Sequence, residues 1–325
     1  MHVLKQFASA SLAIWTVAFA PLAQAQETTV VQMGAGNIAG VYFPVGVAIC
    51  RLVNQNRPEH GLRCAARLSD GSVDNVGRLR DGSVDLAIVQ SDVQNAARMG
   101  DDPFTQTGAF SDLRAVMSLY PEPLTIVAHP DAGISKLDDI QGKRLSIGPA
   151  GSGQRVLLEA LSDALGWDEN ALANDQAMRS GQVAQALCAG EIDAFAMVIG
   201  HPAPPVEEAT EACGAVLIAV EGSGVDDMIS GDSPYALGSI PAGLYAGQTD
   251  SVPSVSVSAT LVTRSDTPDE TISILVETVF SDIDVLRDLD PALVGLDAEV
   301  MVSTGLTAPL HDAAREFYRA QGWVD

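Results

Sequence analysis

Short apolar runs and glycine-rich polar turns alternate along the first hundred residues. The apolar runs predict strands over residues 30–33, 62–67 and 84–90. Apolar residues at helical spacing predict a helix after each strand, over residues 41–54, 72–80 and 91–99. Ser69 or Asp70 is expected to cap the second helix. This strand–helix repetition is typical of a doubly wound α/β sheet.

The pattern is interrupted at Tyr120-Pro121-Glu122-Pro123 and then starts again. Two strands are expected around this segment, over residues 113–119 and 124–128, and the prolines favour an extended crossing between domains. Further elements are a short helix, a strand, two helices, a buried strand and an extended run, over residues 137–140, 144–147, 154–165, 183–188, 192–198 and 255–263. We therefore expect two domains, one over residues 26–122 and 256–325, the other over residues 123–255.

The first 25 residues have the features of a cleaved signal peptide. A short basic start with Lys5 precedes an uncharged, mostly apolar stretch, and Ala23-Gln24-Ala25 fits a small-x-small cleavage site. No later stretch approaches the roughly 18 apolar residues of a membrane span. The sequence therefore predicts a periplasmic protein whose mature chain starts at Gln26. This chain is long enough for two domains.

The chain is strongly acidic. It has 42 Asp and Glu residues against 18 Lys and Arg, a formal charge of −24, and loss of Lys5 with the signal peptide makes it −25. A nucleic-acid partner is excluded on this ground, because phosphate contacts need a basic face. If the ligand is an anion, the site must supply local donors against the field of the whole molecule.

Four cysteines in a secreted chain indicate disulfides, and three pairings are possible. The local pairing, Cys50–Cys64 and Cys188–Cys213, closes short loops and is the one we expect; four buried thiols are the alternative. No CxxC motif occurs, and no histidine lies near any pair, so neither a zinc site nor another metal site is expected.

Two glycine-rich turns follow predicted strands, one in each half of the chain. The first, over residues 34–46, spaces its glycines as G-x-G-x-x-x-G and so is not a dinucleotide fingerprint. The second, over residues 148–153, lacks the Gly-Lys-Ser/Thr of a P-loop, and Ala150 and Gln154 occupy both glycine positions of a nucleophile elbow around Ser152. Each would aim helix N–H groups at the space above the sheet, which suits a small carboxylate between two domains. The alternative is that the glycines only allow tight strand-to-helix packing.

Other polar residues have two interpretations each. Asp92 is either a helix cap or an acceptor for a substrate ammonium group. His201 is either a ligand donor or a solvated loop residue, and Tyr42 and Tyr120 either contact a ligand or pack in the core. The histidines are scattered and no carboxylate pair stands out, so we expect no enzyme activity and no cofactor.

Several short motifs together resemble the TAXI subgroup of solute receptors for TRAP (tripartite ATP-independent periplasmic) transporters. They are Gly40-Val41-Tyr42-Phe43-Pro44-Val45-Gly46, Ile49-Cys50-Arg51-Leu52-Val53-Asn54, Asp70-Gly71-Ser72-Val73-Asp74-Asn75, Gln90-Ser91-Asp92, Leu119-Tyr120-Pro121-Glu122, Gly151-Ser152-Gly153, Ile192-Asp193-Ala194-Phe195, Gly200-His201-Pro202, Ile240-Pro241-Ala242-Gly243 and Pro309-Leu310-His311. The chain departs from the family pattern at Asn37-Ile38-Ala39, which is looser than the usual glycine cluster, and at Asp312-Ala313, where Pro-Gly is usual.

The resemblance implies a type II periplasmic-binding-protein fold, with two α/β domains that close about a hinge on one small ligand. It implies a monomeric receptor that delivers a small carboxylate, such as glutamate, a related acidic amino acid or a dicarboxylate, to a TRAP membrane permease. Carried over residue by residue, the ligand site comprises Asn37, Gly40, Tyr42, Ser72, Ser91, Asp92, Tyr120, Ser152, Gly153, Gln154, Gly200 and His201.

Within that site, the helix starts at Val41 and Gln154 would hold carboxylate oxygens and Asp92 would hold an ammonium group. Two other functions remain open at this point. A binding protein of an ATP-driven transporter or of a sensor would use the same fold, and a secreted hydrolase would use Ser152 as its nucleophile, although the sequence identifies no base for it.

Overall fold

A computed structural model describes residues 29–168, 170–231 and 233–325. The predicted signal peptide and the cleavage site before Gln26 lie outside the described residues and stay predictions. Within those ranges, no helix is both long enough and apolar enough to cross a lipid bilayer.

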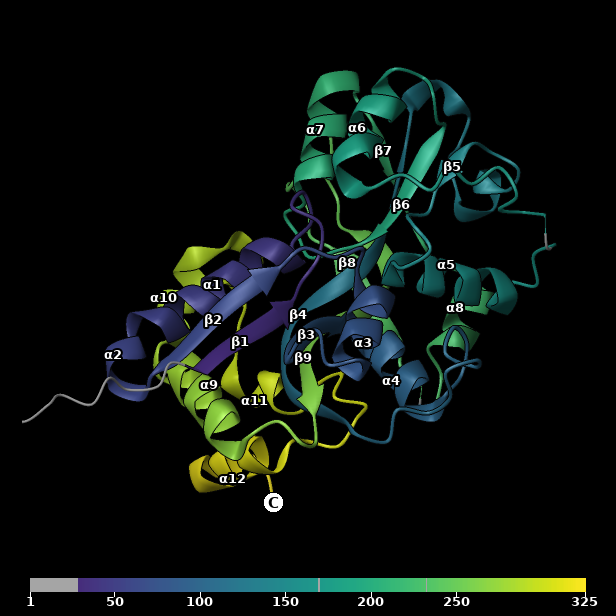
Figure 1. The fold of residues 1–325 in the computed structure, drawn as a ribbon. Coiled ribbons are helices and arrows are strands. Elements are labelled where there is room, and N and C mark those ends of the chain that lie inside the picture. The colour runs from purple at the N-terminus through teal and green to yellow at the C-terminus, as the bar shows by residue number, and fades with distance from the viewer. Residues whose placement is uncertain (1–28, 169, 232) are drawn as a thin grey trace, which may run out of the picture.

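The described strands form one twisted sheet that extends through both halves of the molecule (Figure 1). The strands are β1 (Thr29–Gly34), β2 (Leu62–Arg67), β3 (Leu86–Gln90), β4 (Leu113–Ala128), β5 (Leu145–Ser146), β6 (Ala194–Val198), β7 (Val216–Ile218), β8 (Ala236–Ile240) and β9 (Val252–Arg264). Their order is β2-β1-β3-β9-β4-β6-β5, with β7 added to β4 and β8 to β9. Every residue of β3 and of β6 is buried, because helices cover both faces of these strands.

Strands β4 and β9 join the two halves. β4 pairs antiparallel with β9 as far as Pro123 and pairs with β6 from Leu124 onward. We call the half with β1, β2 and β3 lobe 1 and the half with β5, β6 and β7 lobe 2. The domain limits expected from the sequence, 26–122 with 256–325 and 123–255, stay a prediction.

The two strands predicted around Tyr120-Pro121-Glu122-Pro123 are one continuous strand, so that prediction was wrong. Prolines are tolerated here because this part of β4 pairs with a strand, β9, on one side only, and the missing N–H groups remove no second ladder. The extended backbone that prolines favour also fits a strand.

Helices flank the sheet on both faces (Figure 1). In lobe 1, α1, α9 and α12 share one core, and α3 and α4 pack in another on the opposite face; in lobe 2, α6 and α7 lie opposite α5 and α8. The helices are α1 (Tyr42–Gln55), α2 (Arg57–His60), α3 (Ser72–Arg80), α4 (Ser91–Met99), α5 (Gly153–Ala164), α6 (Ser180–Cys188), α7 (Pro204–Cys213), α8 (Ser223–Met228), α9 (Asp269–Ser281), α10 (Ile283–Leu289), α11 (Ala298–Met301) and α12 (Asp312–Gln321), with 3₁₀ turns η1 (Pro130–Ala132), η2 (Leu137–Ile140) and η3 (Pro291–Leu293).

The cap expected for α3 is different in the structure. Neither Ser69 nor Asp70 caps it; the N-cap is Gly71, with φ 121° and no side-chain cap. Ser69 Oγ instead accepts at 3.3 Å from the N–H of Gly71, the N-cap residue itself, and not from an N–H inside the helix. A glycine is required because this φ lies in the region that side chains disfavour. The first N–H groups of α3 are thus left without a side-chain cap.

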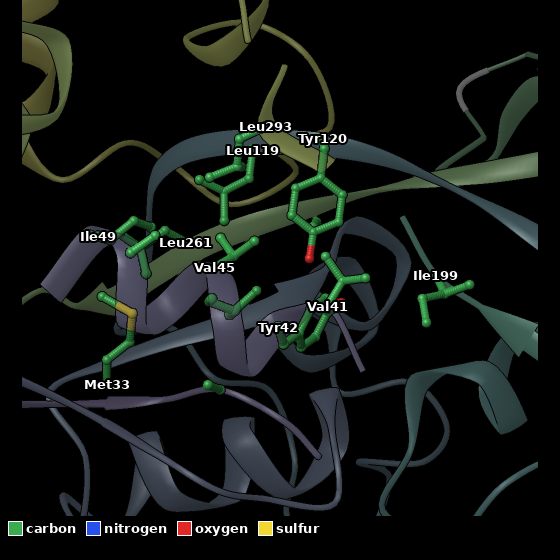
Figure 2. Close-up of a cluster of buried hydrophobic side chains, with 14 of the residues drawn as sticks. Met33, Val41, Tyr42, Val45, Ile49, Leu119, Tyr120, Ile199, Leu261 and Leu293 are labelled. Atoms are coloured by element: carbon green, nitrogen blue, oxygen red, sulfur yellow. The ribbon is translucent and has the colours of Figure 1, made fainter. Parts of the chain in front are cut away.

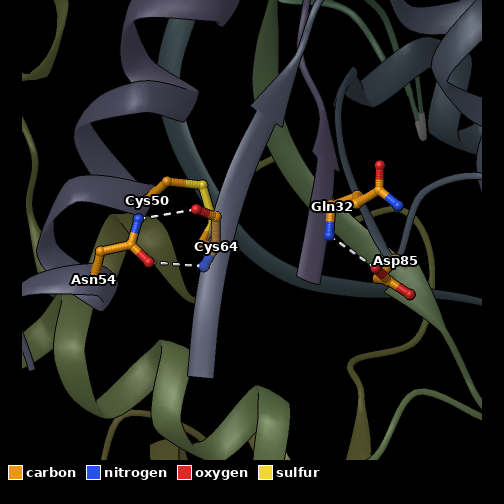
Figure 3. Close-up of a disulfide and its surroundings, with 5 residues drawn as sticks. All are labelled: Gln32, Cys50, Asn54, Cys64 and Asp85. Atoms are coloured by element: carbon orange, nitrogen blue, oxygen red, sulfur yellow. Dashed lines mark hydrogen bonds between the residues drawn. A yellow bond between two sulfur atoms is a disulfide. The ribbon is translucent and has the colours of Figure 1, made fainter. Parts of the chain in front are cut away.

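Both expected disulfides are confirmed: Cys50 bonds Cys64 and Cys188 bonds Cys213. The first links α1 to β2, the edge strand of lobe 1 (Figure 3). Beside it, the Asn54 amide accepts from the Cys64 N–H and donates to the Cys64 C=O, both at 2.9 Å. Asn54 therefore satisfies two backbone groups on a strand edge that would otherwise be open to pairing.

Candidate functional site

A cavity of about 80 Å³ lies between the two lobes. It is large enough for several water molecules, and so for a small ligand. Its walls come from lobe 1, from the hinge strand β4 and from lobe 2. The lining residues are Gly36, Asn37, Gly40, Val41, Tyr42, Asp70, Gly71, Ser72, Gln90, Glu122, Pro149, Ser152, Gly153, Gln154, Arg179, Ser180, Met197, Val198 and Ile199.

Five helices begin at this cavity. Its walls include the N-cap residues of α1, α3, α4, α5 and α6, which are Val41, Gly71, Gln90, Ser152 and Arg179. The N-caps of α1, α3, α4 and α5 make no side-chain cap hydrogen bond, whereas at the start of α6 the Gln182 side chain accepts from the Arg179 N–H at 3.2 Å. Helix N-termini carry free N–H groups and a partial positive charge, so their convergence creates a local environment for an anion.

A buried hydrogen-bonded group forms the floor of the cavity on the lobe 1 side. The Tyr42 hydroxyl donates to Glu122 Oε2 at 2.7 Å and lies 3.4 Å from Ser72 Oγ. Ser72 Oγ in turn accepts from the Gln90 backbone N–H at 3.1 Å. These contacts join the starts of α1, α3 and α4 to the hinge strand β4.

Glu122 is only 1% exposed. Burial raises the pKa of its carboxyl well above the usual range, the hydrogen bond from Tyr42 lowers it, and the charge of Asp92 raises it. Burial also raises the pKa of the Tyr42 hydroxyl, which therefore stays protonated and acts as the donor. A buried acid at an anion-attracting cavity is an unusual combination.

Gln90 is another buried polar side chain on the cavity wall, 3% exposed. Its Oε1 atom makes no hydrogen bond within the described part of the chain. A buried amide oxygen without a partner costs free energy unless something donates to it. Gln90 Oε1 is thus an acceptor without a partner among the described residues, packed against Gly153, where an added Cβ would collide with it.

The lobes touch at the edge of the cavity, so the arrangement is closed. Arg179 of lobe 2 forms an ion pair with Asp70 of lobe 1 at 2.9 Å. The Asp74 N–H donates to the Gly151 C=O at 3.3 Å. At Gly71, an added Cβ would lie 3.2 Å from Ser152 Cα, so the two glycine-containing helix starts face each other closely.

Seven of the residues expected in the site line the cavity: Asn37, Gly40, Tyr42, Ser72, Ser152, Gly153 and Gln154. The other five, Ser91, Asp92, Tyr120, Gly200 and His201, are not among its lining residues. The two glycine-rich turns are thus brought together, as the sequence pattern indicated, whereas the residues after β3 and β6 mostly face elsewhere.

Asp92 is buried in the first turn of α4, and its Oδ1 accepts from the Val93 N–H at 2.8 Å. Its Oδ2 has no hydrogen-bond partner among the described residues. Burial raises the pKa of this carboxyl from 3.8 to about 7. Ser91 beside it is committed elsewhere, because Ser91 Oγ accepts from the Ser258 N–H at 3.1 Å.

Tyr120 and Gly200 pack against each other; a Cβ on Gly200 would lie 2.7 Å from the Tyr120 ring. Figure 2 shows the Tyr120 hydroxyl pointing toward Val41 and Tyr42 at the start of α1. This hydroxyl is buried and lacks a hydrogen-bond partner in the described chain. Tyr120 therefore forms part of the hydrophobic layer between α1, Ile199 of lobe 2 and the hinge.

His201 is held between two hydroxyl groups. Its Nε2 lies 2.8 Å from Thr125 Oγ1 and its Nδ1 lies 2.5 Å from the Tyr245 hydroxyl. Burial lowers the pKa of the imidazole to about 4, so His201 is neutral at neutral pH. The ring braces β4 against the loop that follows β8 and supplies no positive charge to a ligand.

Three functional candidates were missed by the sequence reasoning: Glu122, Gln90 and Arg179. Glu122 and Gln90 were inside quoted motifs, but nothing in their spacing distinguished them from other strand residues. Arg179 directly precedes α6, and a cation at that position could have been recognised as unfavourable for the helix dipole and therefore as a candidate with another role.

The Ser152 hydroxyl, the nucleophile of the hydrolase alternative, donates to the Pro149 C=O at 2.7 Å. In the described ranges no group of three or more His, Cys, Asp or Glu residues could hold a metal ion.

The profile of the NMT1-like family matches residues 33–322, so this chain belongs to the NMT1-like family. Two solved structures are similar to it. A protein of Bordetella bronchiseptica RB50 is 13% identical, with a TM-score of 0.55 over 92% of this chain and 100% of that one. A substrate-binding protein of an ABC uptake transporter from Streptococcus pneumoniae, solved with histidine, is 14% identical, with a TM-score of 0.51 over 82% and 93% of the two chains. With the two hinge strands, this likeness confirms the type II periplasmic-binding-protein fold.

Proposed function

We propose that this protein is an extracytoplasmic solute-binding receptor that captures a small carboxylate in the cavity between its lobes. The main support for the proposal is the convergence of five helix starts on that cavity, four of them without a side-chain cap. In a chain with a formal charge of −24, such local positive potential serves an anion that the surface as a whole would repel.

In this proposal, the first N–H groups of α1 and α5 hold the carboxylate oxygens from opposite lobes. Each charge-assisted hydrogen bond contributes roughly 1.5–3 kcal/mol to binding. Arg179 at the cavity edge adds a positive charge, which its ion pair with Asp70 partly offsets. Closure of the lobes excludes water and strengthens these bonds.

The test is calorimetric titration of the mature chain, purified without reductant and unfolded and refolded to remove any bound ligand. L-Glutamate comes first, then L-glutamine, 2-oxoglutarate, succinate and branched-chain amino acids, with succinamide as the uncharged control. We expect one-to-one binding of at least one carboxylate and none of succinamide. Absence of binding by every carboxylate, with native circular dichroism, would remove the proposed function and leave the fold.

We further propose a TRAP membrane permease as the partner, a periplasmic location and a monomeric state. The motifs shared with TAXI receptors support this assignment. The similarity to a binding protein of an ABC transporter supports the alternative, an ATP-driven importer. Uptake of the bound carboxylate into vesicles separates the two: transport with a TRAP permease and an ion gradient supports the first, and transport that needs an ATPase supports the second.

A further inference from the structure

Glu122 is the feature that the proposed carboxylate site does not explain. Its carboxyl group lines a cavity surrounded by helix N-termini, yet its ionised form would repel a carboxylate brought against it. It is also 1% exposed, and a buried acid is costly unless its oxygens are hydrogen-bonded. Glu122 therefore needs a reason to be at this position.

The protein satisfies only part of its acceptor capacity. Burial favours the protonated form of Glu122, and a cation or donor brought against it favours the ionised form, which offers about four lone-pair positions on two oxygens. Among the described residues, the hydrogen bond to Glu122 comes from the Tyr42 hydroxyl, on Oε2, and no ion pair includes Glu122. The cation that lines the same cavity, Arg179, is paired with Asp70 instead. Donors for the remaining positions can come from whatever occupies the cavity.

The opposite wall of the cavity also favours a ligand with a carboxylate on one side and a hydrogen-bond donor on the other. Gly153, the first residue of α5, faces the lobe 1 wall and offers an N–H donor for a carboxylate, whereas the Ser152 N–H already donates to the Pro149 C=O at 3.0 Å. Gln90 Oε1, a buried acceptor without a partner in the described chain, lies on the lobe 1 wall together with Glu122. Acceptors thus gather on the lobe 1 side of a cavity that is otherwise rich in donors.

We infer that Glu122 selects a carboxylate that also carries a hydrogen-bond donor, an ammonium or a hydroxyl group, and rejects one that places a carbonyl or a second carboxylate there. This inference rests on the proposed carboxylate site. It moves the ammonium-binding role from Asp92, which does not line the cavity, to Glu122.

The experiment compares ligands that differ only at one carbon. Calorimetry on the refolded mature chain uses three series of amino, hydroxy and oxo acids: L-glutamate, L-2-hydroxyglutarate and 2-oxoglutarate; L-leucine, its hydroxy acid and 4-methyl-2-oxopentanoate; L-alanine, L-lactate and pyruvate. For the series that binds, we expect the amino or the hydroxy acid to bind about 10- to 100-fold more tightly than the oxo acid. The member that binds more tightly tells an ammonium from a hydroxyl ligand.

Three variants locate the acceptor. Glu122→Gln keeps the shape and can still accept from Tyr42, and we expect it to lose most of the preference for the donor-bearing ligand. Asp92→Asn is the competing variant. Glu208→Gln, at an exposed position on α7, controls for the loss of one negative charge. Thermal unfolding followed by circular dichroism checks that each variant folds.

Each outcome decides between the claims. If no series binds, the proposed function fails and this inference fails with it. If an oxo acid binds as tightly as its amino and hydroxy counterparts, the carboxylate site stands and the inference is wrong. The inference is equally wrong if the preference survives Glu122→Gln, or if Asp92→Asn alone removes it.

Discussion

At the scale of single residues, two buried acids near the hinge differ in what surrounds them. Glu122 lines the cavity and receives a hydrogen bond from Tyr42 across 80 positions of sequence. Asp92 keeps one oxygen without a partner in the described chain and has a pKa raised to about 7 by burial. Ionisation of Asp92 therefore lowers the stability of the fold.

Asp92 should make the fold less stable as the pH rises. Between about pH 4 and pH 7 the folded state keeps the proton that the unfolded state has lost, so the free energy of unfolding decreases through this interval and is lowest above pH 7. Asp92→Asn removes this decrease. Relative to the parent, we expect the variant to gain more stability at pH 8 than at pH 4, by about 4 kcal/mol at most.

Urea unfolding at pH 4, 6 and 8 measures this difference. The charge of Asp92 also raises the pKa of Glu122, so the difference between variant and parent reports Asp92 together with its interaction with Glu122. A stability difference that is the same at pH 4 and pH 8 would show that Asp92 ionises normally in the folded state.

The sequence could not reveal Glu122 as a site residue. Its neighbours Pro121 and Pro123 predict extended chain, and a single carboxylate between them has no periodicity to compare with. Its position depends on the register of β4 against β9 and on the start of α1, both fixed by long-range pairing. By contrast, Ser72 and Gly153 belong to turns whose glycines mark a strand-to-helix junction, so their place at the cavity was predictable.

At the scale of elements, the start of α5 determines how closely the lobes approach. Gly153 is its first residue, and an added Cβ would collide with Gln90 Oε1 and come within 2.9 Å of Ser72 Oγ. Both neighbours are buried side chains of lobe 1, so the collision lies between the lobes and not inside either one.

Gly153→Ala should therefore weaken ligand binding without unfolding the protein. Forcing an extra carbon into a packed contact costs roughly 1–3 kcal/mol, so we expect binding about 5- to 150-fold weaker by calorimetry. Gly77→Ala in the exposed middle of α3, where an added Cβ meets nothing within 4 Å, is the matched control. It should bind normally and gain about 0.5–1 kcal/mol of stability. Equal affinities of both variants and the parent would contradict the close contact at Gly153.

The disulfides stabilise elements that carry the cavity at their other ends. Cys188–Cys213 joins the last residues of α6 and α7 across a separation of 25 residues. Replacing both cysteines by serine should lower the free energy of unfolding by about 3 kcal/mol, measured in urea without reductant. We expect reductant to lower the free energy of unfolding of the parent by a similar amount. An unchanged free energy of unfolding in the variant would mean that this disulfide contributes little stability.

Elements of this kind were largely predictable from sequence. The first helix–strand series agrees with the structure to within two residues at most ends, because each buried strand is an apolar run and each helix has a regular apolar face. The prediction of two strands in place of β4 was wrong, because a segment that pairs on one side only tolerates prolines that a central strand does not.

At the scale of the whole molecule, two strands connect the lobes and the lobes touch across the cavity edge. The contact between Asp70 and Arg179 is an exposed ion pair, worth about 0–1 kcal/mol, and it is too weak to hold the lobes shut alone. Ligand bonds from both lobes would then supply the remaining free energy of closure.

Removal of the ligand should therefore open the molecule. We expect the refolded, ligand-free chain to have a larger radius of gyration by small-angle X-ray scattering than the same sample with a saturating carboxylate. Identical scattering curves with and without a ligand that binds by calorimetry would mean that closure does not depend on the ligand.

The most direct test of the account is a crystal structure of the mature protein with the carboxylate that binds most tightly. We predict this ligand in the cavity between the lobes, with its carboxylate oxygens within hydrogen-bond distance of backbone N–H groups at the start of α1 or α5. A ligand bound elsewhere, or one whose carboxylate avoids every helix start, would contradict it.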